Sequence, residues 1–294
     1  MRGKLSLIAL GFGIVLLTTG MSGGCGEQTF ESFSYYYPNW MPNGRVICFK
    51  TESRWSEAIW GRRELGDTNY ITAITINDSN EVVAEENLFE TNKGYAEMVC
   101  SPTGEMIVVY TPGYSNGIWI YDYKGNKSEI LNGVSVDSAD WSPDGSKIAY
   151  SADRKLYVVN RDGTNNIQIA TSAEVVAWRV GEKIVYEGIV DGLYFYLFSI
   201  NQDGSNNNQI ISGTDPQKID NNKIVYSGTA NMVKLIYLTG TGEATISDTF
   251  SKSTLKLSFD NTKIVGGDLI TGGGSWIGGI WIINIDGTGE KRLR

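Results

Sequence analysis

The stretch Trp141-Ser142-Pro143-Asp144-Gly145-Ser146-Lys147-Ile148-Ala149-Tyr150 decides the fold of this chain of 294 residues. It joins a turn, built on Pro-Asp-Gly, to a short apolar run that suits a buried strand. Equivalent isoleucines recur at separations of 60, 41, 36, 40 and 40 residues. They are Ile47, Ile107, Ile148, Ile184, Ile224 and Ile264. A period of about forty residues, with several short strands in each repeat, is typical of an architecture of repeated sheets.

A second apolar strand follows these runs and ends in a turn that contains glycine. In the third repeat Leu156-Tyr157-Val158-Val159 leads into Asp162-Gly163, and glycine supplies the positive φ that a tight hairpin turn requires. Similar turns occur at Lys124-Gly125, Asp203-Gly204, Thr241-Gly242 and Asp286-Gly287. The repeat therefore predicts an all-β fold, a six-bladed β-propeller with four-stranded antiparallel blades over residues 38–294.

Three tryptophans near the start of the turns are expected to serve the packing of this fold. Trp40, Trp141 and Trp178 are predicted to be wedges between neighbouring blades, because aromatic side chains bury large areas. Asp144-Gly145 is interpreted as a turn former. At the ends of the chain, residues 29–37 are expected to pack where the ring closes, with an added strand as one form of that packing, and residues 290–294 to form a very short outer strand.

The motif Trp-Ser-Pro-Asp-Gly-x-Lys-Ile-Ala-Tyr, followed by Asn-x-Asp-Gly-Thr, resembles the repeat of TolB-like propellers (WD40-like, PD40-type). Propeller domains of prolyl oligopeptidases share this repeat, and the resemblance covers residues 38–294. It implies a fold and says little about activity. By the same resemblance, TolB-type proteins act in periplasmic complexes that maintain the envelope. They also have an N-terminal α/β domain, for which the chain ahead of the first blade is too short.

The first 24 residues have the layout of an export signal. Arg2 and Lys4 precede an apolar run over residues 5–17, which is too short to span a bilayer comfortably. Ser22-Gly23-Gly24-Cys25 resembles a bacterial lipobox, although serine stands where leucine is usual. We therefore expect a lipoprotein signal peptide over residues 1–24, a lipid on Cys25 and a tether over residues 25–37, with ordinary cleavage as the alternative. The expected location is periplasmic or at the cell surface, with the lipid as membrane anchor.

Charge and composition exclude several classes of function. The net charge is -8, and it becomes -10 without Arg2 and Lys4, so the surface repels phosphate backbones and no nucleic-acid partner is expected. The chain contains no histidine, which excludes catalytic triads and metal sites that need imidazole. The three cysteines show no zinc spacing. We therefore expect no cofactor, no bound metal and no enzymatic activity.

Two cysteines remain if Cys25 carries a lipid. The repeat places Cys48 on a second strand and Cys100 on the innermost strand of the next blade. Both are interpreted as small buried thiols, which is common for cysteine. A disulfide between them is the alternative, because export leads to an oxidising compartment.

One insertion makes the first repeat about twenty residues longer than its neighbours. It covers residues 51–69, and Trp55, Ile59 and Arg63 recur in it at helical spacing. Tryptophan and arginine are enriched at binding hot spots, so the insertion is a candidate partner-binding segment. The alternative is a lid whose tryptophans pack on their own propeller. The candidate residues are Arg54, Trp55, Trp60, Arg62 and Arg63.

Acidic residues mark the segments that lead into successive inner strands. In a propeller these segments meet near one mouth of the central channel, where carboxylates can hold a cation or accept basic groups of a partner. Ordinary solvated loops are the alternative. The candidate residues are Glu97, Asp137, Asp140, Glu174 and Asp215.

The sequence thus predicts a non-enzymatic, monomeric propeller lipoprotein of the cell envelope that serves as a scaffold for a protein partner. The competing hypothesis is a propeller that binds glycans or a small ligand, or a degenerate hydrolase. Acidic and aromatic residues at the channel mouth would serve that second function, since a pair of carboxylates can hydrolyse glycosides without histidine.

Overall fold

A computed structural model describes residues 6–9, 14–17, 20–21, 28–58, 61–76, 82–91, 97–104, 106–110, 117–178, 180–228, 232–248, 255–258, 260–267, 270–272, 275–277 and 280–292. All regular elements in these ranges are β-strands. No helix long and apolar enough to cross a membrane is present among them. The all-β prediction is confirmed for the described part of the chain.

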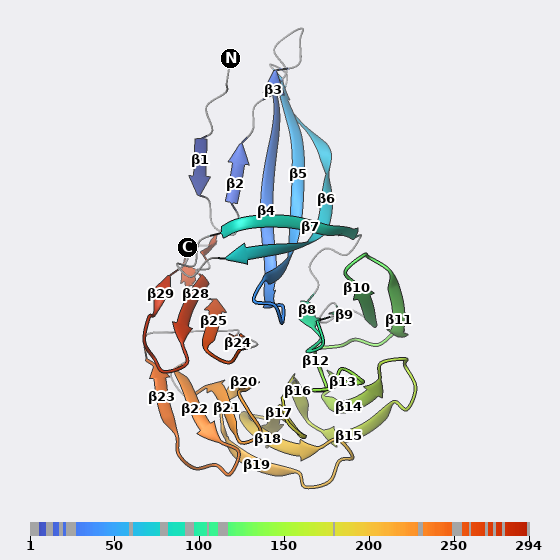
Figure 1. Cartoon of the computed structure of the whole chain (residues 1–294), viewed down its shortest axis with the longest axis vertical. Coiled ribbons are helices and arrows are strands. Elements are labelled where there is room, and N and C mark those ends of the chain that lie inside the picture. Colours follow the sequence, from blue (N-terminus) through green and yellow to red (C-terminus); the bar gives the residue numbers. More distant parts are fainter. Residues whose placement is uncertain are drawn as a thin grey trace.

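The strands form antiparallel sheets in chain order (Figure 1). The first sheet has five strands, β3 (Gly20–Met21), β4 (Gln28–Trp40), β5 (Val46–Ala58), β6 (Gly61–Ile76) and β7 (Val82–Thr91). The second has β8 (Glu97–Cys100), β9 (Met106–Tyr110), β10 (Ile118–Asp122) and β11 (Lys127–Leu131). The third has β12 (Ser138–Trp141), β13 (Lys147–Ala152), β14 (Lys155–Asn160) and β15 (Ile167–Thr171).

The remaining sheets repeat this order. The fourth has β16 (Ala173–Ala177), β17 (Lys183–Val190), β18 (Tyr194–Asn201) and β19 (Asn208–Ser212). The fifth has β20 (Thr214–Lys218), β21 (Lys223–Ser227), β22 (Val233–Tyr237) and β23 (Ala244–Ser247). The last has β24 (Leu255–Leu257), β25 (Lys263–Gly267), β28 (Ile280–Asn284) and β29 (Lys291–Arg292). Two small hairpins pair β1 (Ser6–Ala9) with β2 (Ile14–Leu17) and β26 (Ile270–Gly272) with β27 (Ser275–Ile277).

The core lies between neighbouring sheets. The repeat isoleucine of the third sheet, Ile148, pairs with Trp141 on one side and Val159 on the other, and all three side chains are fully buried. Trp141 packs with Val99 and Ile118 of the second sheet, and its Nε1 donates a hydrogen bond of 2.9 Å to the carbonyl of Val99. The prediction that Trp141 is a wedge is confirmed. Trp40 and Trp178 are buried as well.

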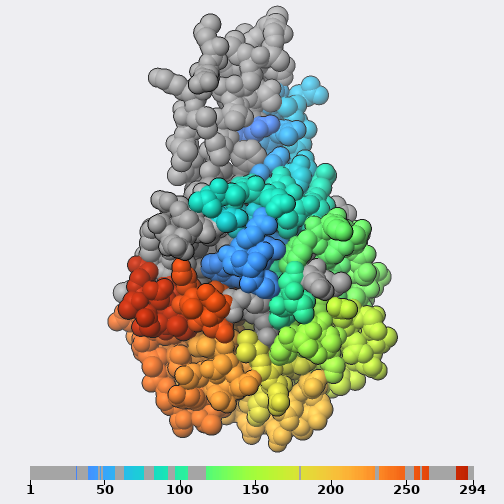
Figure 2. Space-filling model, viewed as in Figure 1, coloured from blue at the N-terminus to red at the C-terminus, as the bar shows by residue number. Residues whose placement is uncertain are grey.

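The innermost strands surround a common centre. Each lies against the innermost strand of the next sheet, from β4 through β8, β12, β16 and β20 to β24, and β24 lies against β4 again. The first and last sheets therefore lie side by side (Figures 1 and 2). The predicted short outer strand at the end of the chain is β29.

Four features of the first and last sheets differ from the prediction. The insertion is not helical, because residues 51–58 and 61–69 lie in β5 and β6 and pair with each other. Residues 29–36 extend β4 and pair with β5, so this stretch is not an added strand of the last sheet. The pairing satisfies backbone groups along the described residues of the insertion, which outweighs a chance helical spacing. The first sheet also has a fifth strand, β3, and the last sheet carries the extra hairpin β26–β27.

Cys48 and Cys100 lie on the predicted strands, β5 and β8. Within the described residues Cys100 is a buried thiol that is not disulfide-bonded. The interpretation as a buried thiol is thus confirmed for Cys100. Burial, together with the neighbouring Cys100 thiol, raises the pKa of Tyr123. Cys25 lies outside the described residues.

Candidate functional site

Strand direction gives the ring two distinct faces. In the third sheet β12 runs from Ser138 to Trp141, and a turn then leads into β13, which runs back in the antiparallel direction. The beginning of an inner strand therefore lies at the same face as the connection between the second and third strands. We call this the start face. The opposite face carries the turns that follow the first and third strands, and we call it the turn face.

Aspartates on the turn face are engaged in local hydrogen bonds. The carboxylate of Asp162 accepts bonds from the Thr164 hydroxyl at 2.6 Å and the Thr164 N–H at 2.9 Å. The bond from the hydroxyl is the largest cause that lowers the pKa of Asp162. The same arrangement recurs at Asp203 with Ser205 and at Asp286 with Thr288. These groups form the turns, as the sequence predicts for Asp144-Gly145.

A groove of about 500 Å³ opens on the turn face of the third sheet. Asp144 in its lining accepts bonds from the Ser142 hydroxyl at 2.6 Å and the Ser146 N–H at 3.0 Å. These bonds hold a turn in place, and Asp162 on the other side does the same. The full lining is Asp144, Gly145, Ser146, Asn160, Arg161 and Asp162. The groove is a consequence of two adjacent turns.

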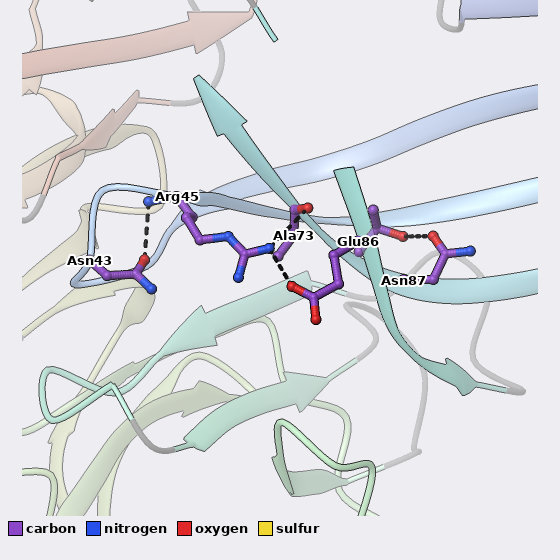
Figure 3. A network of polar contacts seen from close by, with 6 residues as sticks. Asn43, Arg45, Ala73, Glu86 and Asn87 are labelled. Atoms are coloured by element: carbon purple, nitrogen blue, oxygen red, sulfur yellow. Dashed lines mark hydrogen bonds and ion pairs between the residues drawn. The ribbon is translucent and has the colours of Figure 1, made fainter. Parts of the chain in front are cut away.

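The first sheet makes its version of the turn with asparagine (Figure 3). Asn43 Oδ1 accepts a bond of 3.1 Å from the N–H of Arg45. Arg45 Nη2 then reaches Glu86 Oε2 of β7 at 2.8 Å and the carbonyl of Ala73 in β6 at 3.5 Å (Figure 3). The guanidinium thus ties the turn to two strands of the same sheet.

The start face carries carboxyl groups that are shielded from solvent. Glu187, within β17, is only 5% exposed and accepts a 2.9 Å bond from the N–H of Asp215. Burial raises the pKa of Glu187 to about 7, and the carboxylates of Asp215 and Glu174 add to the effect, against the bond from the N–H. Asp215 is the second residue of β20 and has a positive φ of 50°. Burial raises the pKa of Asp215 to about 6, opposed by Lys256 and assisted by Glu97.

The structure thus brings together three of the predicted acidic residues. They are Glu97 of β8, Glu174 of β16 and Asp215 of β20. The negative charge of Glu97 helps to raise the pKa of Asp215. Glu174 also forms an ion pair of 3.4 Å with the exposed Arg154. We call Glu97, Glu174, Glu187 and Asp215, together with Lys256, the acidic cluster.

The other two predicted acidic residues have separate surroundings. Burial raises the pKa of Asp137, and Asp153 in the next turn adds to the effect. Asp140 lies within β12, and its carboxylate accepts bonds from the N–H groups of Trp141 at 2.9 Å and Trp178 at 2.7 Å. Asp140 therefore joins the third sheet to the fourth.

The insertion forms a three-stranded arm that projects from the ring (Figure 1). The arm consists of residues 28–36 of β4, 49–58 of β5 and 61–68 of β6. Because the β5–β6 connection joins a second strand to a third, the arm leaves from the start face. Arg54 pairs with Glu31 at 3.2 Å and with Glu52 at 3.7 Å.

The ion pairs of the arm continue to its base. Lys50 contacts Glu52 at 3.1 Å and Glu85 of β7 at 2.7 Å. Burial works against the charge of Lys50, but the carboxylates of Glu85 and Glu52 raise the pKa of this ammonium. The base of the arm is therefore fixed by charged side chains on one face of the sheet.

The candidate residues of the insertion occupy different places on the arm. Arg54 is exposed and Trp55 is half-buried, and both lie on β5, where consecutive side chains point to opposite faces of the sheet. Arg62 and Arg63 lie on β6, paired in register with Glu57 and Ser56, and Arg63 is exposed. Trp60 lies outside the described residues.

Sequence reasoning missed Glu187 and Lys218. Glu187 follows Lys-Ile-Val-Tyr at the place where other repeats have Ser151 and Ser227, so a comparison of the repeats contains the signal. Lys218 stands at the place of Trp141 and Trp178, with only 4% exposure, and its Nζ donates a 2.6 Å bond to the carbonyl of Lys183. Burial lowers the pKa of Lys218 to about 8, opposed by Asp140.

The chemistry available at the acidic cluster is the binding of positive charge. Within the described residues, no three carboxylate or thiol groups are arranged to hold a metal ion. Glu187 is only 5% exposed, and its carboxylate accepts the backbone N–H of Asp215. The start face therefore offers negative charge around the inner strands and an arm beside it.

Comparisons with known proteins support the fold. Residues 101–188 match the family model of the dipeptidyl peptidase IV N-terminal region. No curated protein matches the chain. A solved structure of a TolB from Agrobacterium tumefaciens, described as putative, has a TM-score of 0.61 at 16% identity, over 72% of this chain and 84% of that chain. The WD40 repeats of RRP9 have a TM-score of 0.51 at 12% identity, over 89% of this chain and 80% of that chain. The described chain is therefore a β-propeller similar in structure to TolB.

Proposed function

We propose that this chain is an exported, lipid-anchored, six-bladed propeller that acts as a non-enzymatic scaffold for a protein partner. Six antiparallel sheets follow one another in the chain, and their innermost strands lie against each other in sequence, with β24 against β4. This arrangement supports the count of six blades. The lipobox-like Cys25 supports the anchor.

The arm is the observation that carries the scaffold function. An insertion that folded down as a lid would cover its own propeller, but this one projects from the ring (Figure 1). Arg63 and Leu65 on β6 are exposed, and Leu65 presents 48% of its surface. A projecting sheet with a rigid, ion-paired base offers a partner a preorganised surface, which reduces the entropic cost of binding.

Glycan binding or hydrolysis is the weaker candidate. The raised pKa values of Glu187 and Asp215 are what a general acid needs. However, Glu187 is buried against the backbone of Asp215, and substrate would have to displace that contact. The contact between Glu187 and the backbone of Asp215 therefore favours binding over catalysis as the proposed role.

The test of the scaffold function is photo-crosslinking in the native envelope. The crosslinker p-benzoylphenylalanine replaces Arg63 on the arm, and in a matched control it replaces Gln168 on the outer strand β15. We expect a discrete protein adduct from position 63 and none from position 168. Equal labelling at the two positions, or no protein adduct at position 63, contradicts binding at the arm.

The test of the anchor is separate. Metabolic labelling with an alkynyl fatty acid should tag the wild-type chain, and Cys25→Ala should lose both the tag and its sedimentation with membranes. An untagged wild-type chain whose mature N-terminus lies beyond Cys25 by mass spectrometry would overturn the anchor without affecting the scaffold function.

A further inference from the structure

A second hairpin of the start face presents apolar side chains to solvent. Leu193, Tyr194 and Phe195 are exposed by 75%, 61% and 43% of their surface. They are consecutive, whereas the other exposed large apolar residues in the described part of the chain are scattered. Single exposed apolar side chains are ordinary, but a contiguous group marks a contact surface. We call residues 189–195 the apolar tip.

The apolar tip protrudes beyond its own sheet. Ile189 pairs with Phe195 and Val190 with Tyr194, so β17 and β18 continue as a two-stranded ribbon. The neighbouring strands do not reach this far. The pairing of β16 with β17 ends at Ala173, opposite Gly188, and the pairing of β19 with β18 ends at Ser212, opposite Tyr196. The ribbon therefore extends past its neighbouring strands at the start face, where Leu193, Tyr194 and Phe195 are exposed while Ile189 and Val190 are half-buried.

Hydrogen bonds hold the base of the apolar tip. Ser172 Oγ donates to the carbonyl of Ile189 at 2.5 Å and accepts from its N–H at 3.0 Å. On the other edge the N–H of Gly213 donates to the carbonyl of Phe195 at 3.1 Å. The turn itself uses Asp191 and Gly192, both with positive φ. The exposed side chains are thus presented on a rigid support, which favours binding without ordering costs.

The fold does not require apolar residues at this place. The equivalent connection of the third sheet, between β13 and β14, is a tight turn made by Asp153 and Arg154, and both residues are exposed. A charged turn therefore serves the same connection in the neighbouring sheet. The apolar side chains of the fourth sheet call for an explanation outside folding.

Charge indicates the kind of surface that the apolar tip fits. Asp191 lies exposed in the turn of the apolar tip, four residues after Glu187, which is buried in β17. Glu174 and Asp215 of the acidic cluster border the base of β17, since both act on the carboxyl group of Glu187. With a net charge of -8 for the chain, an anionic membrane surface is repelled. A protein pocket with basic residues at its rim is complementary.

We propose that the apolar tip docks into an apolar pocket of a protein partner, with lysine or arginine residues of that partner facing Asp191 and the acidic cluster. Tyrosine is among the residues that dominate interface energies. This proposal rests on the scaffold function proposed above and names a contact surface distinct from the arm. The contact buries the three apolar side chains and pairs charges around them.

The experiment places p-benzoylphenylalanine at position 193 in the full chain, in the native envelope, with position 153 of the equivalent charged turn as the matched control. We expect a discrete adduct from position 193 to a protein, with the crosslinked peptide mapping to apolar residues of that protein that are flanked by lysine or arginine. Position 153 should label this site at least tenfold less. A lipid adduct, an adduct with a second copy of this chain, or no adduct at position 193 overturns the proposal.

A triple variant tests the same contact without a crosslinker. Leu193→Ser, Tyr194→Ser and Phe195→Thr together should reduce co-purification of the crosslinked protein at least tenfold, while the thermal unfolding midpoint stays close to that of the wild type. Asp153→Ser with Arg154→Ser is the control and should retain the partner. If position 63 yields a protein adduct but position 193 does not, the scaffold function stands and only the docking of the apolar tip fails. If neither position yields one, both proposals fail.

Discussion

The two faces of the ring use the same residue type in opposite ways. On the turn face Asp162, Asp203 and Asp286 accept bonds from hydroxyl and N–H groups two residues ahead, and these bonds lower the pKa of each carboxyl group. On the start face burial raises the pKa of Asp215 and Glu187. Local hydrogen bonds stabilise carboxylates and build turns, whereas burial makes the charged form of a carboxyl group less favourable. Such costs are concentrated at functional sites more often than elsewhere.

The faces also differ in regularity. On the turn face the third, fourth and last sheets share one turn, in which a glycine with positive φ follows the aspartate, as at Gly163. A Cβ atom at this glycine would approach the carbonyl oxygen of Ile130 in the preceding sheet to 2.9 Å. The start face has a different feature at the same connection in three sheets: the arm, the charged turn at Asp153 and the apolar tip. The comparison separates what builds the ring from what distinguishes this protein.

The largest effect on the free energy of unfolding should come from the core between neighbouring sheets, which lies between the two faces. Trp141→Ala removes a fully buried indole between the second and third sheets and should lower the free energy of unfolding by about 3–5 kcal/mol. Trp141→Phe keeps an aromatic ring but loses the hydrogen bond to Val99. It should lower the free energy of unfolding by about 1 kcal/mol beyond the effect of the smaller buried area. Denaturant unfolding measures both. Equal losses in the two variants would mean that the hydrogen bond, and not the packing, dominates.

Glu187 tests the electrostatic cost of the start face. Its folded pKa of about 7 lies above the ordinary value of 4.5, so the stability that this carboxyl contributes is complete below pH 4.5 and is lost as the pH rises through about 7. Glu187→Gln should therefore raise the free energy of unfolding at pH 8 by about 1–3 kcal/mol and leave it nearly unchanged at pH 4. Chemical denaturation at the two pH values measures the difference. Glu129→Gln, on the exposed strand β11, is the control, and a gain in it of the same size would refute the assignment.

Asp144 on the turn face tests a pKa shift in the opposite direction, because its pKa is lowered. Hydrogen bonds from Ser142 and Ser146 hold the pKa of Asp144 below its ordinary value, so its stabilisation is present above pH 3.8 and disappears as the pH falls through the folded value. Asp144→Ala should cost about 1 kcal/mol at pH 7. Asp144→Asn, which retains an acceptor oxygen, should cost less. A loss for Asp144→Ala that persists at pH 2 would show that the carboxylate charge is not its origin.

The smallest effect is expected on the arm. Arg54 is half-exposed and pairs with Glu31 and Glu52, and exposed ion pairs of this kind contribute little. Arg54→Ala should change the free energy of unfolding by less than about 0.5 kcal/mol, and added salt should reduce the change further. Thermal unfolding at low and high salt measures it. A loss above about 2 kcal/mol would make the arm a part of the folding core and weaken its role as a platform.

The sequence by itself determined the repeat, the strands that contain its isoleucines and the turns with their aspartates. These features depend on residues close together in the chain, because the bonds of Asp144 reach only Ser142 and Ser146. The helical spacing of Trp55, Ile59 and Arg63 was misleading, because it is also a local pattern and does not reveal the strand pairing of the insertion. Residues 29–36 pair with β5 across a gap in sequence that no local pattern reveals.

Only the tertiary structure decided which acidic residues meet and which hairpins protrude. The charges of Glu97 and Lys256 act on Asp215 because the inner strands surround one centre and β24 lies beside β20. The carboxylate of Asp140 instead accepts bonds from the N–H groups of Trp141 and Trp178. The exposure of Leu193, Tyr194 and Phe195 follows from neighbouring strands that end before the apolar tip does. Burial and charge proximity are sums over sequence-distant neighbours, so they are settled only when the sheets pack around their common centre.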